Sequence, residues 1–387
     1  MSARLEKAIL MAAVRSGSAG RAWGARLDVL RSTGVGYALQ RRAELARERQ
    51  TGRAALERFY RDVWANAAGE LGAEVSELEG GFLEIRRGAV ATRVWRQLSA
   101  LDDALSLKLA LDKTLVHGLL AARGVHVPDH LEFSRANIGP ALRFIAESGP
   151  GPGRPMFVVK PADGGRGGAG VTGGVRTEVD LARAVLSATR LDSRLLIERQ
   201  VPGDMHRLLF CDGELLDVVV RLAPHVTGDG RSSILELIAR ENERRLQAGL
   251  AQSLITVDLD CLLALAAAGR APRSVPSPGE RVQVKSASSE NAEHENRTIR
   301  SWSEDLVSEC AEAVRAVGLR LAGVDVVTPD IDRPLAETGG AIIEVNGTPG
   351  FQYHHVVAEP ENATRIAVPV LEQVLEATGL PTTITPR

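Results

Sequence analysis

Two apolar, β-branched runs in the last quarter of the chain constrain its fold more than any other feature. Residues 323–327 (Gly-Val-Asp-Val-Val) and 341–346 (Ala-Ile-Ile-Glu-Val-Asn) each have the character of a buried strand. The segment between them contains two prolines and two glycines, as a loop joining neighbouring strands would. Because side chains alternate along a strand, Glu344 and Asn346 share one face, and Asp325 joins them if the two strands pair.

These three polar side chains indicate a metal site. Carboxylate and amide oxygens without histidine or cysteine suit Mg²⁺, which bridges a few carboxylates to phosphates, and Mn²⁺ would accept the same ligands. A single acidic residue at a strand end is more often solvated. Two of them in adjacent apolar runs would be costly to bury without a cation. We therefore expect Asp325, Glu344 and Asn346 to hold the metal ion of a nucleotide enzyme.

Composition excludes several other classes of protein. The 387 residues carry a formal net charge of −2, so there is no global signature of nucleic-acid binding. No run of about 18 apolar residues is present, which argues against a membrane-spanning helix. Three cysteines without a CxxC spacing favour a reducing compartment and argue against a zinc site. The N-terminal residues imitate a short export signal, but Arg15 interrupts it, and we expect a cytoplasmic protein.

Three regions are expected along the chain: a basic helical extension (1–50), a small N-terminal α/β domain (51–107) and a larger α+β domain (108–387). Mixed charge at helical spacing in the extension favours a solvated helix face over a nucleic-acid arm. The extension could pack on a partner subunit, and we expect a homo-oligomer. Apolar spacing and turn signals predict a helix at 53–71, strands at 75–78, 82–86 and 90–94, and one helix from a cap at Ser99 or Asp102 to Arg123.

A glycine-rich loop follows a predicted strand at residues 156–160. Glycines let backbone amides approach phosphate oxygens closely, and a second strand is expected at 171–175. The loop contains GxGxxG at Gly165, Gly167 and Gly170, but it neither follows its strand directly nor opens a helix, as a dinucleotide fingerprint must. We therefore expect a strand–loop–strand lid over phosphates. Lys160 at the strand end could reach a phosphate, with a surface lysine as the alternative.

Six separated motifs resemble those of ATP-grasp ligases, and most closely the ATP-grasp region of the cyanophycin synthetase family. They are residues 157–161 with the glycine loop, 197–203, 223–230, 322–325, 337–346 and 349–351, and they stand in the family's order. The resemblance implies an ATP-grasp fold, in which two α/β subdomains clasp ATP. It extends more loosely to the N-terminal α/β unit. The Mur-ligase-like domain of that family has no counterpart in these residues, so a complete version of that enzyme is not expected.

The resemblance also implies roles for individual residues. ATP-binding residues would be the phosphate lysines Lys113 and Lys160, the lid glycines Gly164, Gly165, Gly167, Gly168 and Gly170, and the adenine hinge at Glu198 with the backbone of Arg199 and Val201. Met205 aligns with the usual ribose-binding acid, so either Asp204 serves one position early or this contact is missing. Lys285 would contact the terminal phosphate, and Arg207 and Arg221 would face the acceptor carboxylate or the acyl phosphate. Asp325, Glu344 and Asn346 match the Mg²⁺ ligands.

The activity implied is that of an ADP-forming carboxylate–amine ligase, which joins an activated carboxylate to an amine of an amino acid or peptide. A kinase, or a nucleotide-binding module that recruits a partner through its basic helices, is the alternative. The family's substrate loop is replaced by residues 289–296, an acidic run expected to be solvated, with a cationic substrate as the alternative. Candidates for proton transfer are His225, His294, His354 and His355, although packing or surface roles are commoner for histidine.

Overall fold

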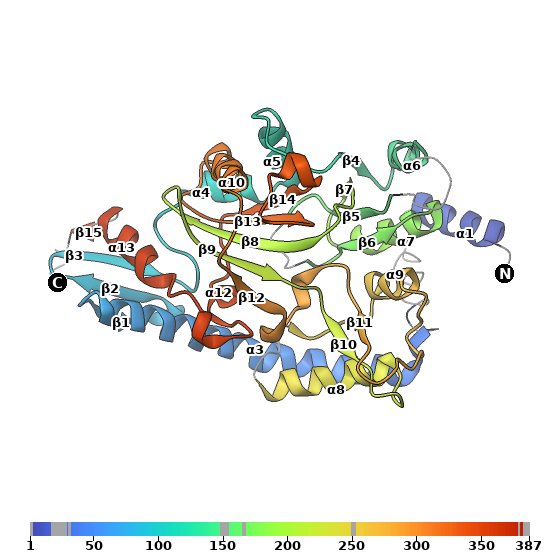
Figure 1. The fold of residues 1–387 in the computed structure, drawn as a ribbon, viewed down its shortest axis with the longest axis horizontal. Coiled ribbons are helices and arrows are strands. Elements are labelled where there is room, and N and C mark those ends of the chain that lie inside the picture. The colour runs from blue at the N-terminus through green and yellow to red at the C-terminus, as the bar shows by residue number, and fades with distance from the viewer. Residues whose placement is uncertain are drawn as a thin grey trace.

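The structure, a computed structural model, describes residues 3–16, 29, 32–147, 155–164, 168–248, 253–377 and 380–381. The described strands form four sheets, and the helices pack around them (Figure 1). All the strand pairs are antiparallel. The expected mixed α+β fold is therefore confirmed.

The central sheet has the strand order β12-β9-β8-β13-β14. Its strands are β8 (Asp204–Cys211), β9 (Glu214–Arg221), β12 (Asn296–Ile299), β13 (Leu321–Thr328) and β14 (Ala341–Asn346). On one face Leu208, Val324 and Val326 belong to a core shared with α4 (Ala104–Ala110), α5 (Lys113–Ala121) and α10 (Glu304–Val317). Alternation leaves Arg207 and Asp325 on the opposite face. One short helix, α11 (Leu335–Thr338), lies between β13 and β14 in the chain.

A second sheet has the order β4-β7-β5-β6 and is covered by helices. Its elements are β4 (His130–Ser134), β5 (Phe157–Pro161), β6 (Thr172–Val175), β7 (Arg194–Arg199), α6 (Gly139–Ala146) and α7 (Glu178–Ala188). β5 pairs with β6, so the expected strand–loop–strand arrangement is confirmed. Thr177 and Asp180 form a capping box at the start of α7. Helix α1 (Ala3–Ser16) buries Leu10 and Val14 in the same core, so this part of the extension packs within its own chain.

A smaller unit is built on the two-stranded sheet β10-β11. Its elements are β10 (His225–Thr227), α8 (Ile234–Gln247), α9 (Leu259–Ala267) and β11 (Arg281–Gln283), followed by the 3₁₀ turns η3 (Ser288–Glu290) and η4 (Glu293–Glu295). Its core joins β10 and β11 to both helices, with Ile238, Cys261 and Val284 fully buried. β12 follows η4 directly, so this unit leads straight into the edge of the central sheet.

The fourth sheet, β1-β2-β3-β15, packs against a long helix. The elements are α3 (Val35–Glu70), β1 (Glu74–Glu77), η1 (Glu79–Gly81), β2 (Leu83–Arg87), β3 (Val90–Val94), α12 (Gln352–His355), η5 (Pro360–Asn362), α13 (Ala367–Ala377) and β15 (Leu380–Pro381). The three predicted strands of this unit are confirmed to within one residue at each end. α3 runs without a break across residue 50, and β15 returns from the far end of the chain to pair with β3. The proposed domain boundaries remain predictions.

The predicted helix from Ser99 or Asp102 to Arg123 is wrong in two respects. Two helices stand in its place, and their caps are Asp103 for α4 and Asp112 for α5. The Asp102 carboxylate instead accepts a hydrogen bond from the backbone N–H of Arg320. Residues 148–154, which are rich in glycine and proline, lie outside the described residues. Among the described helices, none combines the length and apolar character needed to cross a membrane.

Candidate active site

The two predicted carboxylates face each other across the sheet. β13 and β14 pair with Asp325 directly opposite Glu344 and Gly323 opposite Asn346. On the other side of β13, Asp325 is opposite Arg207 of β8. Directly opposed residues of an antiparallel pair project to the same face, so these side chains share one surface. The pairing predicted from the sequence is therefore confirmed.

Each carboxylate is ion-paired with a different cation. Arg207 donates hydrogen bonds to Asp325 from both Nε and Nη2, and Nη2 lies 2.8 Å from Oδ2. Lys113, the first residue of α5, pairs with Glu344. The amide nitrogen of Asn346 donates to Oδ2 of Asp325 and to the carbonyl of Gly323, each at 3.3 Å. The negative charges of the site are thus balanced by side chains from other elements.

These pairings shift the ionisation of the groups involved. Burial alone would raise the pKa of Glu344, but Lys113, Lys160 and Arg207 outweigh it and lower the pKa to about 2. Burial likewise opposes the charge on Lys113, yet Glu344, Glu198 and Asp325 raise its pKa. Both groups are therefore charged at neutral pH. Lys160 thus acts on the pKa of Glu344, and Glu198 acts on that of Lys113, so both residues lie close to the proposed metal ligands.

Lys160 is buried rather than exposed on the surface. Its Nζ lies 2.7 Å from Oε2 and 2.8 Å from Oε1 of Glu198, and both side chains are about 5% exposed. The register explains the contact, since Lys160 is opposite Leu196 and Glu198 is two residues further along β7. Arg199 uses its backbone N–H to bind the carbonyl of Asp129, and Val201 follows the end of β7. The structure does not bring Asp204 to the site. It is exposed at the start of β8, and strand alternation directs it to the other face of the sheet from Arg207.

The described part of the glycine loop approaches the site from β5. The backbone N–H of Gly164 donates to the carbonyl of Leu111 at 2.6 Å, and a Cβ on this residue would lie 2.7 Å from Nζ of Lys113. A side chain at this position would therefore displace the lysine ammonium. Gly168 and Gly170 both have φ of +78°, and a Cβ on Gly168 would meet the side chain of Ser289. Gly165 and Gly167 lie outside the described residues.

Arg221 differs from the other cations at the site because it is buried without a carboxylate partner among the described residues. Its Nη2 donates to the carbonyl of Ser288 at 3.2 Å and to Oδ1 of Asn291 at 3.4 Å, and its Nε has no partner. Burial lowers the pKa of its guanidinium. A buried arginine of this kind is suited to bind an anion.

Tyr353 is a site residue that the sequence reasoning missed. Its ring lies 3.7 Å from the guanidinium carbon of Arg221 and 5.6 Å from that of Arg207. It therefore stacks against both predicted acceptor arginines. Upstream, Tyr60 of α3 donates to Oε1 of Gln352 at 2.9 Å and accepts from the backbone N–H of Phe351 at 3.1 Å. The only sequence signal for Tyr353 was the motif at 349–351, which ends two residues before it.

Lys285 occupies a separate acidic cluster. Its Nζ lies 2.7 Å and 2.8 Å from the carboxylate oxygens of Asp258, 3.6 Å from Asp260 and 3.8 Å from Glu290. Burial disfavours its charge, but the three carboxylates raise its pKa. Asp260 also accepts a hydrogen bond of 2.8 Å from the backbone N–H of Gly173 on β6. The structure thus places Lys285 among carboxylates of which one also binds the backbone of β6, and its ion-pair partners differ from those of Lys113 and Lys160.

The acidic run at 289–296 is not the solvated loop that was expected. Asn291, Glu295 and Asn296 are at most 3% exposed. The carboxylate of Glu290 also has partners within the chain. It accepts a hydrogen bond from the backbone N–H of Thr256 at 2.8 Å and lies near Lys285. The fully buried Arg245 pairs with Glu295 at 3.1 Å. Because these carboxylates are satisfied internally, they do not form a receptor for a cationic substrate.

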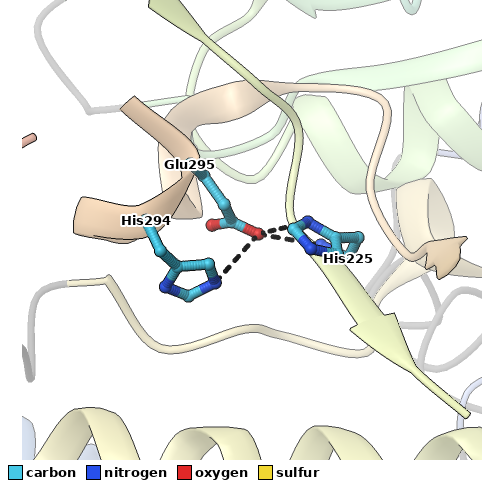
Figure 2. Close-up of side chains that lie close together, drawn as sticks. All are labelled: His225, His294 and Glu295. Atoms are coloured by element: carbon cyan, nitrogen blue, oxygen red, sulfur yellow. Dashed lines mark hydrogen bonds and ion pairs between the residues drawn. The ribbon is translucent and has the colours of Figure 1, made fainter. Parts of the chain in front are cut away.

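Two of the four candidate histidines are packed next to the arginines. His354 is fully buried, and its Nδ1 lies 2.7 Å from Oδ2 of Asp217. The other oxygen of Asp217, Oδ1, accepts a hydrogen bond from Thr364 at 2.6 Å. The ring of His355 packs edge-on against Phe59. These contacts support the packing interpretation for both residues. His225 and His294 lie elsewhere, on β10 and η4 (Figure 2).

The donor set of Asp325, Glu344 and Asn346 fits Mg²⁺. All three offer hard oxygen atoms, they share one sheet face, and no histidine or cysteine lies among them. Asp325 is 4% exposed and already requires a cation to balance its charge. Arg207 balances the charge of Asp325, and Lys113 balances that of Glu344.

Comparisons with known proteins extend the resemblance. No protein-family model matches the sequence. Cyanophycin synthetase from Trichormus variabilis is 32% identical over 284 residues, which cover 72% of this chain and 31% of that protein. The Synechocystis enzyme is 32% identical over 319 residues, covering 78% and 34%. Glutathione biosynthesis bifunctional protein GshAB from Enterococcus faecalis is 28% identical over 296 residues, covering 73% and 37%. The chain therefore spans about a third of the length of these relatives.

Two solved structures align over much of the chain. A bifunctional glutathione synthetase from Pasteurella multocida aligns with a TM-score of 0.49 and 23% identity, covering 79% of this chain and 41% of that one. A D-alanine–D-alanine ligase from Bacillus anthracis gives a TM-score of 0.43 at 17% identity, covering 71% and 69%. The assignment rests on the sequence relatives and on the order of the six motifs. The chain belongs to the ATP-grasp ligase superfamily and is a distant homologue of parts of cyanophycin synthetase and GshAB.

Proposed function

We propose that the chain is an ADP-forming carboxylate–amine ligase acting on an amino acid or peptide. The observation that carries this proposal is the buried Arg221, which has no carboxylate partner among the described residues and stands next to the Arg207–Asp325 pair. A metal-type carboxylate pair with two lysines serves ATP. The additional anion site at Arg221 serves a second substrate, which a simple nucleotide-binding module would not need.

The reaction balances in two steps. A substrate carboxylate oxygen attacks the γ-phosphorus of ATP, so that the bond to ADP breaks and an acyl phosphate forms. The nitrogen of an amine then attacks the acyl carbon, phosphate leaves, and the amine loses a proton. Neither step requires a nucleophilic side chain, so the protein contributes by positioning and by stabilising charge.

Lys113 and Lys160 would bind the phosphates of ATP. They pair with Glu344 and Glu198, and nucleotide phosphates would replace these carboxylates as their partners. Asp325, Glu344 and Asn346 would hold Mg²⁺, which neutralises charge on the transferred phosphoryl group when it is bound. Arg221 and Arg207 would orient the acceptor carboxylate, and the glycine lid would exclude water from the acyl phosphate.

The test is a matrix of amino acids and dipeptides offered in pairs with Mg-ATP, with ADP release measured and the products of active wells identified by mass spectrometry. We expect release to require both a carboxylate and an amine, and the product to be an amide. Glu344→Gln should lower the rate by at least about 100-fold. Glu309→Gln, which alters an α10 glutamate bound to His126, should leave it unchanged.

Two outcomes would overturn the proposal. A phosphorylated acceptor that accumulates without any amine would identify a kinase. Failure of every pair to stimulate ADP release, from a protein that still binds Mg-ATP, would leave a nucleotide-binding module.

A further inference from the structure

Two histidines and a glutamate converge at a point that shares no residue with the proposed ATP site (Figure 2). Nδ1 of His225, the first residue of β10, lies 3.0 Å from Oε1 of Glu295. Nε2 of His294 lies 3.9 Å from the same oxygen. The three ligand atoms are all within 4.8 Å of one another. Two imidazole nitrogens and a carboxylate oxygen form a typical donor set for transition metals.

Glu295 is held rigidly in the orientation that a ligand needs. Its side chain is fully buried, and Oε2 accepts from Arg245 at 3.1 Å and from the backbone N–H of Ala292 at 2.7 Å. Oε1 accepts from the backbone N–H of His225 at 2.9 Å and has a further lone pair on the side of the imidazoles. The carboxylate therefore cannot rotate away, and one oxygen stays directed at the two rings.

The two imidazoles can reach a common ion. The side chain of His225 is 15% exposed and that of His294 is 39% exposed. Only the neutral ring offers a lone pair to a metal. Because η4 carries His294 at a half-exposed position, its ring has room to turn.

We propose that Nδ1 of His225, Nε2 of His294 and Oε1 of Glu295 bind one divalent transition-metal ion of the Zn²⁺ type, with water as the fourth ligand. Metal–ligand bonds of about 2.0–2.2 Å place tetrahedral ligand atoms about 3.3–3.6 Å apart. The cluster reaches that spacing when His294 moves inward by about an ångström. The cysteine spacing argued against a zinc site, but it carried no information about histidines distant in the sequence.

Two arginines beside the rings compete with such an ion. Nη2 of Arg281 lies 3.2 Å from Nδ1 of His225, and Nη2 of Arg244 lies 3.3 Å from Nδ1 of His294. Both arginines are exposed, and Arg244 is also bound to Glu241 at 2.9 Å. Arg245 stays in place, because it binds Oε2, the oxygen that the metal does not use. Removing the charge of Arg281 should therefore strengthen metal binding, since like charges repel.

The position of this site links two segments near Arg221. His225 belongs to β10, while His294 and Glu295 follow Ser288 and Asn291, whose oxygens are the acceptors of Arg221. A bound ion would fix the 288–296 segment to β10. We expect this to hold the Arg221 acceptors more rigidly, an effect that rests on the proposed function and is separate from the metal site itself.

The experiment uses the full chain, stripped of metal by a chelator and titrated with Co²⁺ in excess Mg²⁺, which saturates the oxygen site. Tetrahedral Co²⁺ absorbs strongly in the visible range, and we expect one such ion per chain that Zn²⁺ displaces. His294→Ala and His225→Ala should each weaken binding by at least about 10-fold, the effect that loss of even an outer-shell partner can have. Arg281→Gln, at an exposed position, should tighten it.

His126→Ala is the matched control. His126 is half-exposed and pairs with Glu309 at 2.7 Å, but no third ligand joins them among the described residues, so this variant should titrate like the unaltered protein. Absence of a visible cobalt band, or an equal band in His294→Ala, would overturn the proposal. The readout involves no nucleotide. A failure of the ligase proposal and a failure of the metal site therefore give different results.

Discussion

Replacement of the two buried arginines of the site by methionine should change stability in opposite directions. Arg207 and Arg221 are 5% and 4% exposed and stack on the same tyrosine ring. Arg207 is bound to Asp325 by two contacts, whereas Arg221 has no carboxylate partner in the described part of the chain. Methionine keeps much of the length of either side chain and removes the charge. The comparison therefore isolates the effect of the missing partner.

The structure sets the size of each effect. Arg207→Met leaves Asp325 buried without its cation, which costs about 3–5 kcal/mol. Arg221→Met removes a charge that burial disfavours, and its hydrogen bonds of 3.2 and 3.4 Å are at or beyond the long end of the normal range. The loss of its stacking on Tyr353, worth about 2 kcal/mol when desolvated, offsets part of that gain. We expect a net gain of about 1 kcal/mol.

Urea unfolding without nucleotide measures both variants. The midpoint should fall for Arg207→Met and rise for Arg221→Met, with little change in slope. Arg221→Met should nevertheless lose ligase turnover, because the group that binds the acceptor has gone. A loss of more than about 1 kcal/mol for Arg221→Met would refute the reasoning that burial of a lone charge is costly here.

Three further predictions concern residues around the site. Burial, with Lys160 nearby, lowers the pKa of His117 from 6.5 to about 3. The folded state therefore keeps the ring neutral. The contribution of this residue to stability is full above pH 6.5 and is lost as the pH falls toward 3. His117→Gln should therefore make the urea midpoint depend less on pH between these values, and an unchanged pH profile would contradict this prediction. Tyr60→Phe leaves the N–H of Phe351 and Oε1 of Gln352 without their shared partner and should cost about 1–3 kcal/mol in urea unfolding, whereas a neutral result would show that water replaces the hydroxyl. Tyr353→Leu should lower kcat/KM for the carboxylate by about 2- to 30-fold while Tyr353→Phe retains activity; equal loss in both variants would assign the effect to the hydroxyl instead.

The metal-type face could be predicted from the sequence because it depends on local rules. Alternation along 323–327 and 341–346, with a proline- and glycine-containing connection, was enough to place Asp325 on the same face as Glu344 once the strands pair, whereas the register came from the structure. The capping box of Thr177 and Asp180 was visible for the same reason, since both partners lie within one turn.

The parts that could not be predicted depend on contacts between distant residues. Asp112 ends the first of two helices because it caps the second and also binds Arg194, a residue far along the chain. The 289–296 segment was expected to be solvated because its composition is acidic, and only the fully buried Arg245 shows why it is not. The partners of Lys160 and Lys285 were hidden in the same way. No local pattern reports which carboxylate will lie opposite a lysine.

Helix α3 has a mechanical consequence. At 36 residues it is about 54 Å long, and its two ends belong to different parts of the molecule. Near its start, the Tyr37 hydroxyl accepts the backbone N–H of Val257 in the β10–β11 unit; near its end, Tyr60 anchors the turn before Tyr353. As a stiff rod, the helix is expected to link the position of the β10–β11 unit to that of the turn before Tyr353. Shortening or breaking the rod should uncouple the two units while leaving each of their cores intact.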